Sequence, residues 1–274
     1  MSEPGETRDA RLTFGDVADV YDEIRPTYPA AVFDEFFALL GSRPGVLEVG
    51  PGTGQATKDL LAHGAVVDAV EISPSMAARL RSNLPSERLH VRVGDFETID
   101  LAPESVDAVF SASAYHWISP AAQLDRPALV LRSGGVLAVV GVIQVDSPED
   151  RGFYAAAQPI YERYGQGHAD PPAPARTDAE PTIQHALISD PRFREVEVHR
   201  WDWDQTYTAA GYRKLMLSFS DTNMMAAGDR EGLLDDMESF IDSHFDGHVT
   251  RPLVVTLTTA RRESRGDDSA RHSR

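Results

Sequence analysis

The chain contains no cysteine among its 274 residues. Disulfide bonds, thiolate nucleophiles and zinc sites built from cysteine are therefore excluded. It also has no apolar run of about 18 residues, the length that spans a bilayer as a helix. Its first residues are acidic and lack the basic and apolar regions of a secretory signal. We therefore expect a cytoplasmic protein that has no membrane partner.

Basic residues are also scarce. The 26 lysines and arginines face 43 acidic side chains, which gives a formal net charge of −17. Such a field repels nucleic acid and anionic membrane surfaces, so a small-molecule partner is favoured over nucleic acid. The nine histidines show no metal-binding spacing, and we expect no metal. The 42% hydrophobic content is enough for a substantial core, whereas the oligomeric state leaves no signal.

The most informative stretch is residues 46–55, where four strand-type residues run into a glycine-spaced turn. Gly50, Gly52 and Gly54 permit positive φ and carry no Cβ, so a ligand can lie directly against the main chain at the carboxyl end of the strand. The following residues, after Gln55, have the pattern of a short helix. The alternative is an ordinary glycine-rich turn between a strand and a helix.

The residues around the glycines indicate which ligand the turn would hold. A dinucleotide fingerprint needs G-x-G-x-x-G, and the third glycine of that pattern is absent whether the count starts at Gly50 or at Gly52. A P-loop needs Gly-Lys-Ser/Thr, and none follows. Glu48 precedes the glycines, where it would repel a phosphate and suit a cation. The pattern therefore disfavours a phosphate-bearing ligand.

Glu48 and the three glycines resemble the first motif, E/D-x-G-x-G-x-G, of class I S-adenosylmethionine-dependent methyltransferases. S-adenosylmethionine carries a sulfonium and an ammonium group and no phosphate. The resemblance extends over roughly residues 14–145. It implies S-adenosyl-L-methionine as cofactor, S-adenosyl-L-homocysteine as product, and cofactor contacts at Glu48, at the glycines and at Gln55.

The segment that precedes the glycine turn carries a second resemblance. Helical spacing over residues 14–24 ends at two prolines, and a second helix is expected over 30–40. Between them, Y-x-x-x-R-P-x-Y-P resembles a segment of a small-molecule branch of the family, near trans-aconitate methyltransferase. This resemblance implies that Tyr21 and Arg25 lie near the methionine carboxylate, which a guanidinium suits, and that Tyr28 lies near the substrate. A surface helix that ends before the prolines is the alternative.

A second buried strand, over residues 65–71, ends in an acid about twenty residues past the glycines. At this offset an α/β nucleotide fold places a carboxylate on ribose hydroxyls, so Glu71 is the predicted ribose ligand and Ile72 lies beside it. Ser73 is expected to cap the next helix. Met76, in its first turn, would pack near the adenine edge or serve as a plain core methionine.

Two further strand ends carry candidate cofactor contacts. After the third expected strand, the resemblance implies that Asp95 accepts a hydrogen bond from the adenine amine and that Phe96 lies against the adenine ring. Without the resemblance, Gly-Asp at a strand end indicates only a turn. The fourth strand ends near Ser111 and Ala112, which are also expected at the cofactor.

That strand is followed by Tyr115, His116 and Trp117. Exposing three adjacent aromatic rings to water is unfavourable, so their presence at a strand exit indicates a binding surface. They resemble the family's A-x-H-W stretch, at the wall between methyl donor and acceptor. Tyr115 and Trp117 are therefore predicted substrate contacts. His116 is the candidate general base, because histidine titrates near neutral pH. The alternative for His116 is a wall residue that shapes the pocket.

Strands that alternate with helices predict an α/β, Rossmann-like, doubly wound sheet. Strands at 193–201 and 253–259 bring the total to seven, and the resemblance makes these last two the antiparallel end pair of a mostly parallel sheet with a helical cap. The expected organisation is a flexible N-terminus at 1–13, a cofactor-binding core with lid helices at 14–145, a cap insertion at 146–192, end strands with a helical insertion at 193–262, and a disordered tail at 263–274.

Together these features predict methyl transfer to a small, apolar or planar acceptor, at oxygen, nitrogen or carbon, by in-line displacement. Positioning and exclusion of water can carry much of such catalysis. The cap aromatics that suggest this acceptor are also explained by helix packing, and the proline-rich loop after residue 168 is either a lid or a disordered excursion. Two alternatives stay open: a protein of this fold that binds without methylating, and a nicotinamide-dependent oxidoreductase.

Overall fold

The structure is a computed structural model that describes residues 27–167 and 173–263. Its contacts divide the chain into two units. Of the described residues, the sheet unit comprises 28–141, 180–200 and 256–263, and the insertion unit comprises 142–167, 173–179 and 201–255. Tyr21 and Arg25 lie outside the described residues.

A seven-stranded sheet forms the centre of the sheet unit, with the order β3-β2-β1-β4-β5-β9-β6. Neighbours among the first five strands are parallel. Continuous apolar runs produce these strands, because both of their faces are covered. The strands are β1 (Gly45–Val49), β2 (Val66–Glu71), β3 (Leu89–Val93), β4 (Val106–Ala112), β5 (Leu131–Gln144), β6 (Phe193–Asp202) and β9 (Leu253–Arg262).

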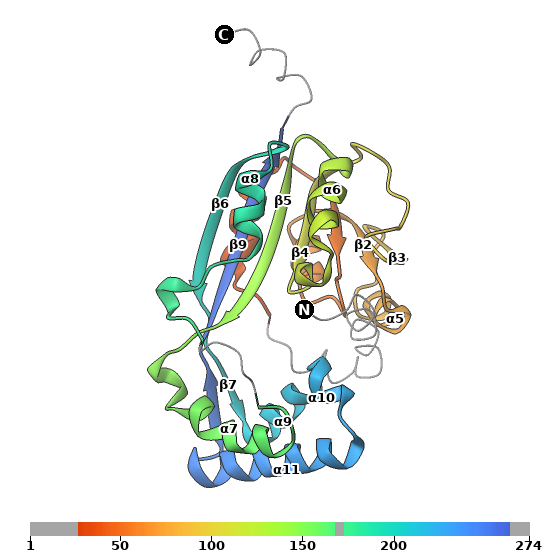
Figure 1. The fold of residues 1–274 in the computed structure, drawn as a ribbon. Helices are drawn as coiled ribbons and strands as arrows, with labels where there is room; N and C mark the ends of the chain where they lie inside the picture. Colours follow the sequence, from red (N-terminus) through yellow and green to blue (C-terminus); the bar gives the residue numbers. More distant parts are fainter. Residues whose placement is uncertain (1–26, 168–172, 264–274) are drawn as a thin grey trace. The chain divides into compact units, whose positions relative to one another are not determined.

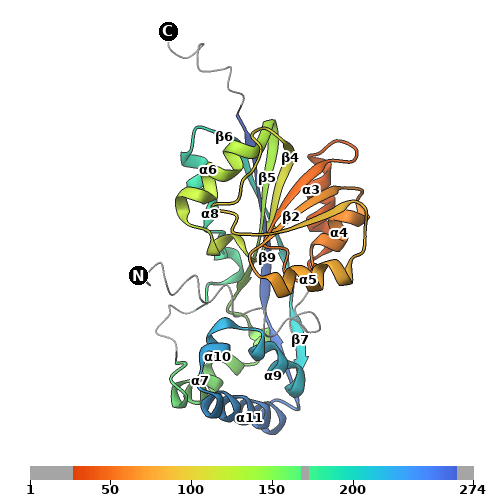
Figure 2. The same ribbon diagram turned by 90° about the vertical axis from the view of Figure 1, so that its right-hand side faces the viewer.

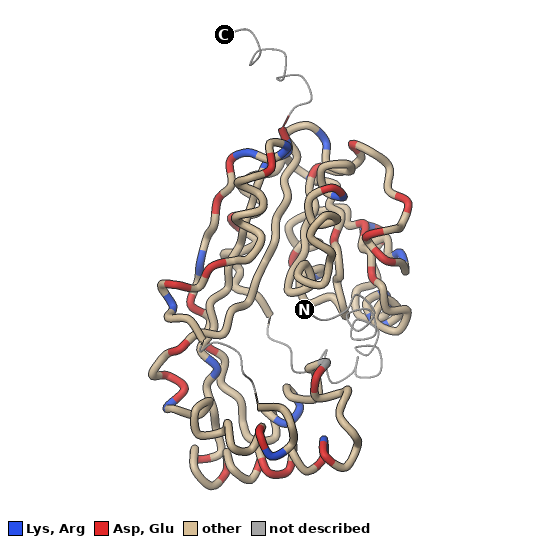
Figure 3. The backbone as a smooth tube through the Cα atoms, viewed as in Figure 1, with Lys and Arg blue, Asp and Glu red and all other residues tan. Residues whose placement is uncertain are grey.

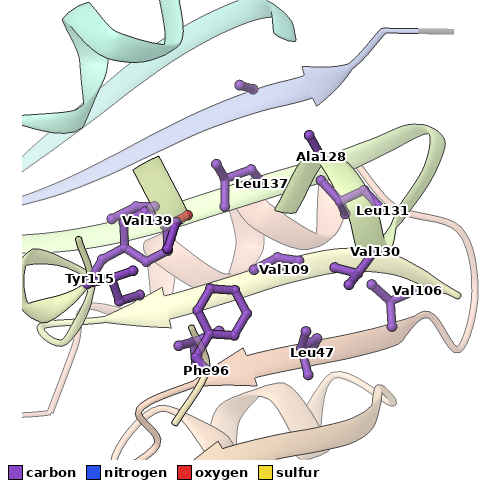
Figure 4. Close-up of a cluster of buried hydrophobic side chains, with 14 of the residues drawn as sticks. Leu47, Phe96, Val106, Val109, Tyr115, Ala128, Val130, Leu131, Leu137 and Val139 are labelled. Carbon is purple, nitrogen blue, oxygen red and sulfur yellow. The ribbon is translucent and has the colours of Figure 1, made fainter. Parts of the chain in front are cut away.

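Strand β9 runs against its neighbours. The Trp203 N–H donates to the Leu253 carbonyl and the Glu263 N–H donates to the Arg192 carbonyl, so opposite ends of β6 and β9 meet. In Figure 4 the arrow of β9 points opposite to the arrows of β1 and β4. The predicted mostly parallel seven-stranded sheet with an antiparallel end pair is confirmed.

Helices cover both faces of the sheet (Figure 2). On one face lie α6 (Pro120–Val130) and α8 (Ile183–Ser189), over a core that includes Leu47, Val109 and Leu137 (Figure 4). On the other lie α3 (Ala30–Ala38) and α4 (Thr57–Ala62). Phe36 of α3 packs on Phe110 with ring centroids 5.0 Å apart. Both faces of the sheet are therefore covered by helices that pack on buried apolar side chains.

The insertion unit is mainly helical (Figure 1). Helices α9 and α11 pack together with α7 over a core of their own that includes Phe153, Tyr212 and Met237. A two-stranded antiparallel sheet of β7 and β8 completes it. The elements are η3 (Pro148–Asp150), α7 (Phe153–Arg163), η4 (Arg176–Asp178), β7 (Gln205–Thr208), α9 (Ala209–Leu217), α10 (Ser220–Met224), α11 (Ala227–His244) and β8 (His248–Arg251).

Several boundaries differ from those that the sequence patterns predict. The glycine pair at 134–135 suggests a turn before the fifth strand, yet β5 begins at Leu131 and passes through it as an irregularity, with Gly134 at φ +74° and a register shift against β4. Local composition signals a turn, and pairing with β4 overrides it. The short elements α8, β7 and β8 carry no clear periodicity and were not predicted. The proposed domain boundaries stay a prediction.

Acidic side chains are spread through both units rather than gathered on one element (Figure 3). Among the described residues, no helix combines the length and the hydropathy that crossing a membrane requires.

Candidate active site

The glycine turn between β1 and α4 adopts the backbone that its sequence predicts. Gly50, Gly52 and Gly54 have φ values of +67°, +60° and +110°. The Gly50 N–H donates to the Val70 carbonyl at 3.0 Å, which ties the start of the turn to β2. A Cβ on Gly50 would lie 2.5 Å from the Cβ of Ala114, so a side chain there would clash with the loop after β4. Only glycine satisfies both constraints at this position.

The third glycine has a different neighbour. A Cβ on Gly54 would lie 2.8 Å from Leu80 Cδ1 and 2.9 Å from Leu84 Cδ1, on and just after α5 (Pro74–Asn83). Its bare Cα therefore allows the turn to approach this helix. Next to it, Gln55 Nε2 donates to Thr53 Oγ1 at 2.7 Å, so the predicted cofactor contact Gln55 takes part in the turn itself.

Glu71 ends β2, is 6% exposed, and accepts two backbone hydrogen bonds. Gly52 N donates to one carboxylate oxygen at 3.0 Å and Ser73 N donates to the other at 2.9 Å. Burial raises the pKa of Glu71, and these N–H groups act in the opposite direction. Each oxygen keeps a further lone pair for a hydroxyl. The acid is thus fixed against the glycine turn, where the sequence places a ribose ligand.

The helix after Glu71 begins as predicted. The Ser73 side chain accepts a hydrogen bond from Met76 N at 3.4 Å, and proline occupies the first helical position. Ile72 is half-buried, and Met76 is 2% exposed. Met76 therefore packs in the core, and its predicted contact with the adenine edge stays a prediction.

Glu48 is the most unusual ionisable group of the site. It lies within β1, is 1% exposed, and its Oε2 has no hydrogen-bond partner among the described residues. Burial raises the pKa of Glu48 to about 8, and the neighbouring negative charge of Glu71 adds to the effect. A buried polar atom without a partner is costly and indicates a missing ligand or a functional role. A cation bound beside this carboxyl would lower its pKa and favour the charged carboxylate.

Asp95 and Phe96, after β3, are placed differently from each other. Asp95 is half-buried, and its Oδ1 accepts the Glu97 N–H at 2.9 Å in a local turn. Phe96 is only 5% exposed and packs in the core (Figure 4). The Arg126 Cζ lies 5.6 Å from the centre of its ring. Its ring does not lie open to a ligand, so the predicted stacking on adenine lacks support from its position.

The exit of β4 is held by two serines. Ser111 is fully buried and donates to the Val49 carbonyl at 2.8 Å, so its hydroxyl fastens β4 to the end of β1. Ala112 is half-buried beside it. Ser113 has φ +55°, which is unusual for a residue other than glycine, and its hydroxyl accepts a hydrogen bond from Tyr28 OH at 3.0 Å. The structure therefore brings the predicted substrate residue Tyr28 to this strand end, through a serine that no sequence signal marks.

The three adjacent aromatic residues after β4 diverge. They form the single turn η2 (Tyr115–Trp117). Tyr115 is 3% exposed, belongs to the core, and donates its hydroxyl to the Gln123 carbonyl at 2.5 Å. The predicted substrate contact of Tyr115 is therefore not supported. His116 is exposed and Trp117 is half-buried, with ring centroids 5.0 Å apart, so these two side chains lie outside the core.

The acidic side chains at the carboxyl ends of the strands fit S-adenosylmethionine, which carries positively charged groups and no phosphate. The buried carboxyls of Glu48 and Glu71 flank the turn, and residues 50–56 contain no lysine or arginine. Such a turn suits a cationic ligand better than a phosphate. Within the described ranges, no group of three or more His, Asp or Glu residues could hold a metal ion.

Comparison with known proteins agrees with this geometry. A methyltransferase domain family model matches residues 47–139. An uncharacterized methyltransferase of Mycobacterium tuberculosis is 31% identical over 237 residues, which cover 86% of this chain and 88% of the relative.

Two solved structures share the fold. The YcgJ protein of Bacillus subtilis has a TM-score of 0.54 at 14% identity, over 86% of this chain and all of that one. The phosphoethanolamine N-methyltransferase 2 of Haemonchus contortus, in complex with phosphomonomethylethanolamine and S-adenosylhomocysteine, has a TM-score of 0.53 at 16% identity, over 90% of this chain and 57% of that one.

The sheet order and the glycine turn define a Rossmann-like methyltransferase. With the similarity to the mycobacterial relative, the chain belongs to the class I S-adenosylmethionine-dependent methyltransferases. Its cofactor is S-adenosyl-L-methionine, and the predicted family, enzyme class and cofactor are confirmed. The nicotinamide oxidoreductase alternative is set aside.

Proposed function

We propose that the methyl acceptor is a small organic molecule with apolar or planar surface, methylated at oxygen, nitrogen or carbon. The observation that supports this is the exit of β4, where the planar, apolar ring of Trp117 is half-buried and the Tyr28 hydroxyl donates to Ser113 at 3.0 Å. Pockets for small molecules are mostly apolar, with few polar groups. The net charge of −17 further supports a small acceptor over nucleic acid. The cytoplasmic location stays a prediction.

S-adenosylmethionine supplies an activated methyl group on a sulfonium that leaves readily. The chain's part is to bind, orient and exclude water. In this proposal Glu71 holds the ribose hydroxyls, Glu48 faces the cationic end, and Asp95 accepts from the adenine amine. The remaining predicted cofactor contacts are Gln55, Ile72, Met76, Ser111 and Ala112, together with the three glycines.

On the acceptor side, Tyr28 and Trp117 are the proposed contacts. His116 is exposed at the strand exit and carries a ring nitrogen that can accept the proton of an acceptor hydroxyl or acidic carbon. Where the acceptor is an amine with a free lone pair, positioning alone suffices. His116 then serves as a wall of the site.

The first test is calorimetric titration of the full chain with S-adenosylhomocysteine, with NAD as control. We expect binding of the first and none of the second. Release of S-adenosylhomocysteine is then measured with a panel of small hydroxyl, amine and carboxylic acid compounds, and with ribosomal RNA. Turnover with RNA alone would overturn the small-molecule proposal.

A further inference from the structure

The insertion unit encloses a cavity of about 180 Å³, and one of the side chains that line it is a positively charged arginine. Arg251, the last residue of β8, lines it and keeps part of its surface accessible. Its Nε donates to Tyr154 OH at 3.1 Å, and its Nη2 donates to Gln144 Oε1 at 3.0 Å. Its Cζ lies 5.6 Å from the ring centre of Phe219. Every one of these partners is a neutral group.

Other arginines of the same unit are neutralised. Arg176 Nη2 lies 2.6 Å from Asp204 Oδ1, and Arg213 Nη2 lies 2.7 Å from Glu231 Oε2. Arg251, by contrast, makes no ion pair with any carboxylate of the described residues. A charge held away from water without a counter-charge is unfavourable. The position is therefore suited to an anion that is not part of the chain.

The neighbouring phenols do not supply that anion. Burial raises the pKa of Tyr154 and of Tyr212 well above the usual value, so both are neutral hydroxyls near neutral pH. Asp221 also lines the cavity and is exposed to solvent. An acid in that place favours a ligand of low negative charge over a multiply charged one such as a phosphate monoester.

The remaining hydrogen-bond donors match a carboxylate. A guanidinium has five N–H donors, and the Nη1 of Arg251 has no hydrogen-bond partner in the described part of the chain. The hydroxyls of Tyr161 and Tyr212, 3.1 Å apart, lie in the same wall. Arginine binds carboxylates through two parallel hydrogen bonds. The cavity of about 180 Å³ exceeds the roughly 10–15 Å³ that one water needs.

From this arrangement we infer that the cavity binds a small organic carboxylate, with its charged group on Arg251 and its hydrocarbon part against Phe219 and Met216. The inference rests only on contacts within the insertion unit. In the sequence alone, Arg251 is a charged residue near the start of a predicted strand, and no motif marks it as part of a binding site.

The test is calorimetric titration of the cofactor-free full chain with benzoate, and with benzamide as the uncharged analogue. We expect benzoate to bind and benzamide to bind at least tenfold more weakly. Arg251→Met should lower benzoate affinity at least tenfold. Arg213→Met is the matched control, because it removes the same charge from the same unit outside the cavity, and it should keep wild-type affinity.

Two further measurements separate loss of the site from loss of the fold. Arg251→Lys keeps the charge and loses the two-pronged geometry, so it should bind benzoate at least several-fold more weakly than wild type. The melting temperature of Arg251→Met should stay equal to or above that of wild type, because an uncompensated charge is removed. A large decrease would indicate a structural role and overturn the inference.

Other outcomes are equally decisive. Equal benzoate affinity in wild type and Arg251→Met would overturn the site. The absence of benzoate binding up to about 20 mM would also overturn it, because a concentration of that order detects even a Kd in the millimolar range. Inorganic phosphate that binds more tightly than benzoate would overturn the carboxylate class. Benzoate binding without S-adenosylhomocysteine binding would refute the proposed function alone, whereas the reverse result would refute this inference alone.

Discussion

The buried carboxyl of Glu48 leads to a quantitative prediction for Glu48→Gln. Burial raises the pKa of Glu48 from its ordinary value of 4.5 to about 8. Below pH 4.5 the carboxyl is protonated in the folded and in the unfolded chain, so it adds no difference between them. As the pH rises towards 8, the unfolded chain ionises and the folded chain stays protonated. The wild-type protein therefore loses stability over this window, because a raised folded pKa favours the protonated state.

Glutamine has nearly the same shape and cannot ionise, so the variant does not share this loss. One pKa unit corresponds to about 1.4 kcal/mol. From the two pKa values, the stability gain of Glu48→Gln over wild type is less than about 1 kcal/mol at pH 5, about 3 kcal/mol at pH 7 and about 4 kcal/mol at pH 8. A constant offset from the new amide shifts all three values together.

The measurement is urea unfolding at these three pH values, followed by far-ultraviolet circular dichroism. Glu35→Gln, the same substitution on the exposed side of α3, is the matched control variant. A stability difference for Glu48→Gln that stays flat between pH 5 and 8 would refute the reasoning. It would mean that Glu48 is ionised in the folded protein.

Glu71→Ala should weaken S-adenosylhomocysteine binding by roughly 1.5–3 kcal/mol, the value of a hydrogen bond to a charged group; unchanged affinity in calorimetry would remove the ribose assignment. Gly50→Ala places a Cβ 2.5 Å from the Ala114 Cβ, at a residue whose φ is +67°. We therefore expect the free energy of unfolding to fall by about 2 kcal/mol or more and the cofactor to bind more weakly. Wild-type values for both quantities would contradict the close packing. His116→Ala should lower the methyl-transfer rate ~10²-fold with unchanged cofactor affinity, and a change in acceptor affinity alone would show that it is a wall residue.

Much of the sheet unit is predictable, because its signals are local. Apolar runs of strand length alternate with helical patterns, and parallel strands need such crossovers. Glu71 could be assigned to a strand end from its offset alone, and Ser73 could be assigned to a helix cap from its residue type. Both positions depend on backbone course, which composition and spacing determine well.

Side-chain direction at the strand exits could not be predicted in the same way. Tyr115, His116 and Trp117 are neighbours in sequence, yet the tight turn that carries them sends the first into the core and leaves the second exposed. Phe96 likewise belongs to the core of the sheet unit. Such directions depend on packing partners that are distant in the chain, such as Gln123 for Tyr115.

The insertion unit was the least predictable part. Its aromatic residues gave a helical pattern, but the strands β7 and β8 are four residues each and carry no periodicity. The surroundings of Arg251 arise from residues as far apart as Gln144 and Phe219. No local pattern could show that this arginine has no carboxylate partner among the residues that the structure describes.

The place of Gly54 against α5 has a consequence for how glycine signatures are interpreted. Its missing side chain makes room for Leu80 and Leu84, and a ligand takes no part in that requirement. A descendant of this protein that had stopped methylating would therefore still be constrained to keep this glycine, simply in order to fold. The third glycine of the motif is therefore a requirement of the fold, whereas the acids Glu48 and Glu71, which we propose as cofactor contacts, are the positions at which a loss of cofactor binding would be expected to show.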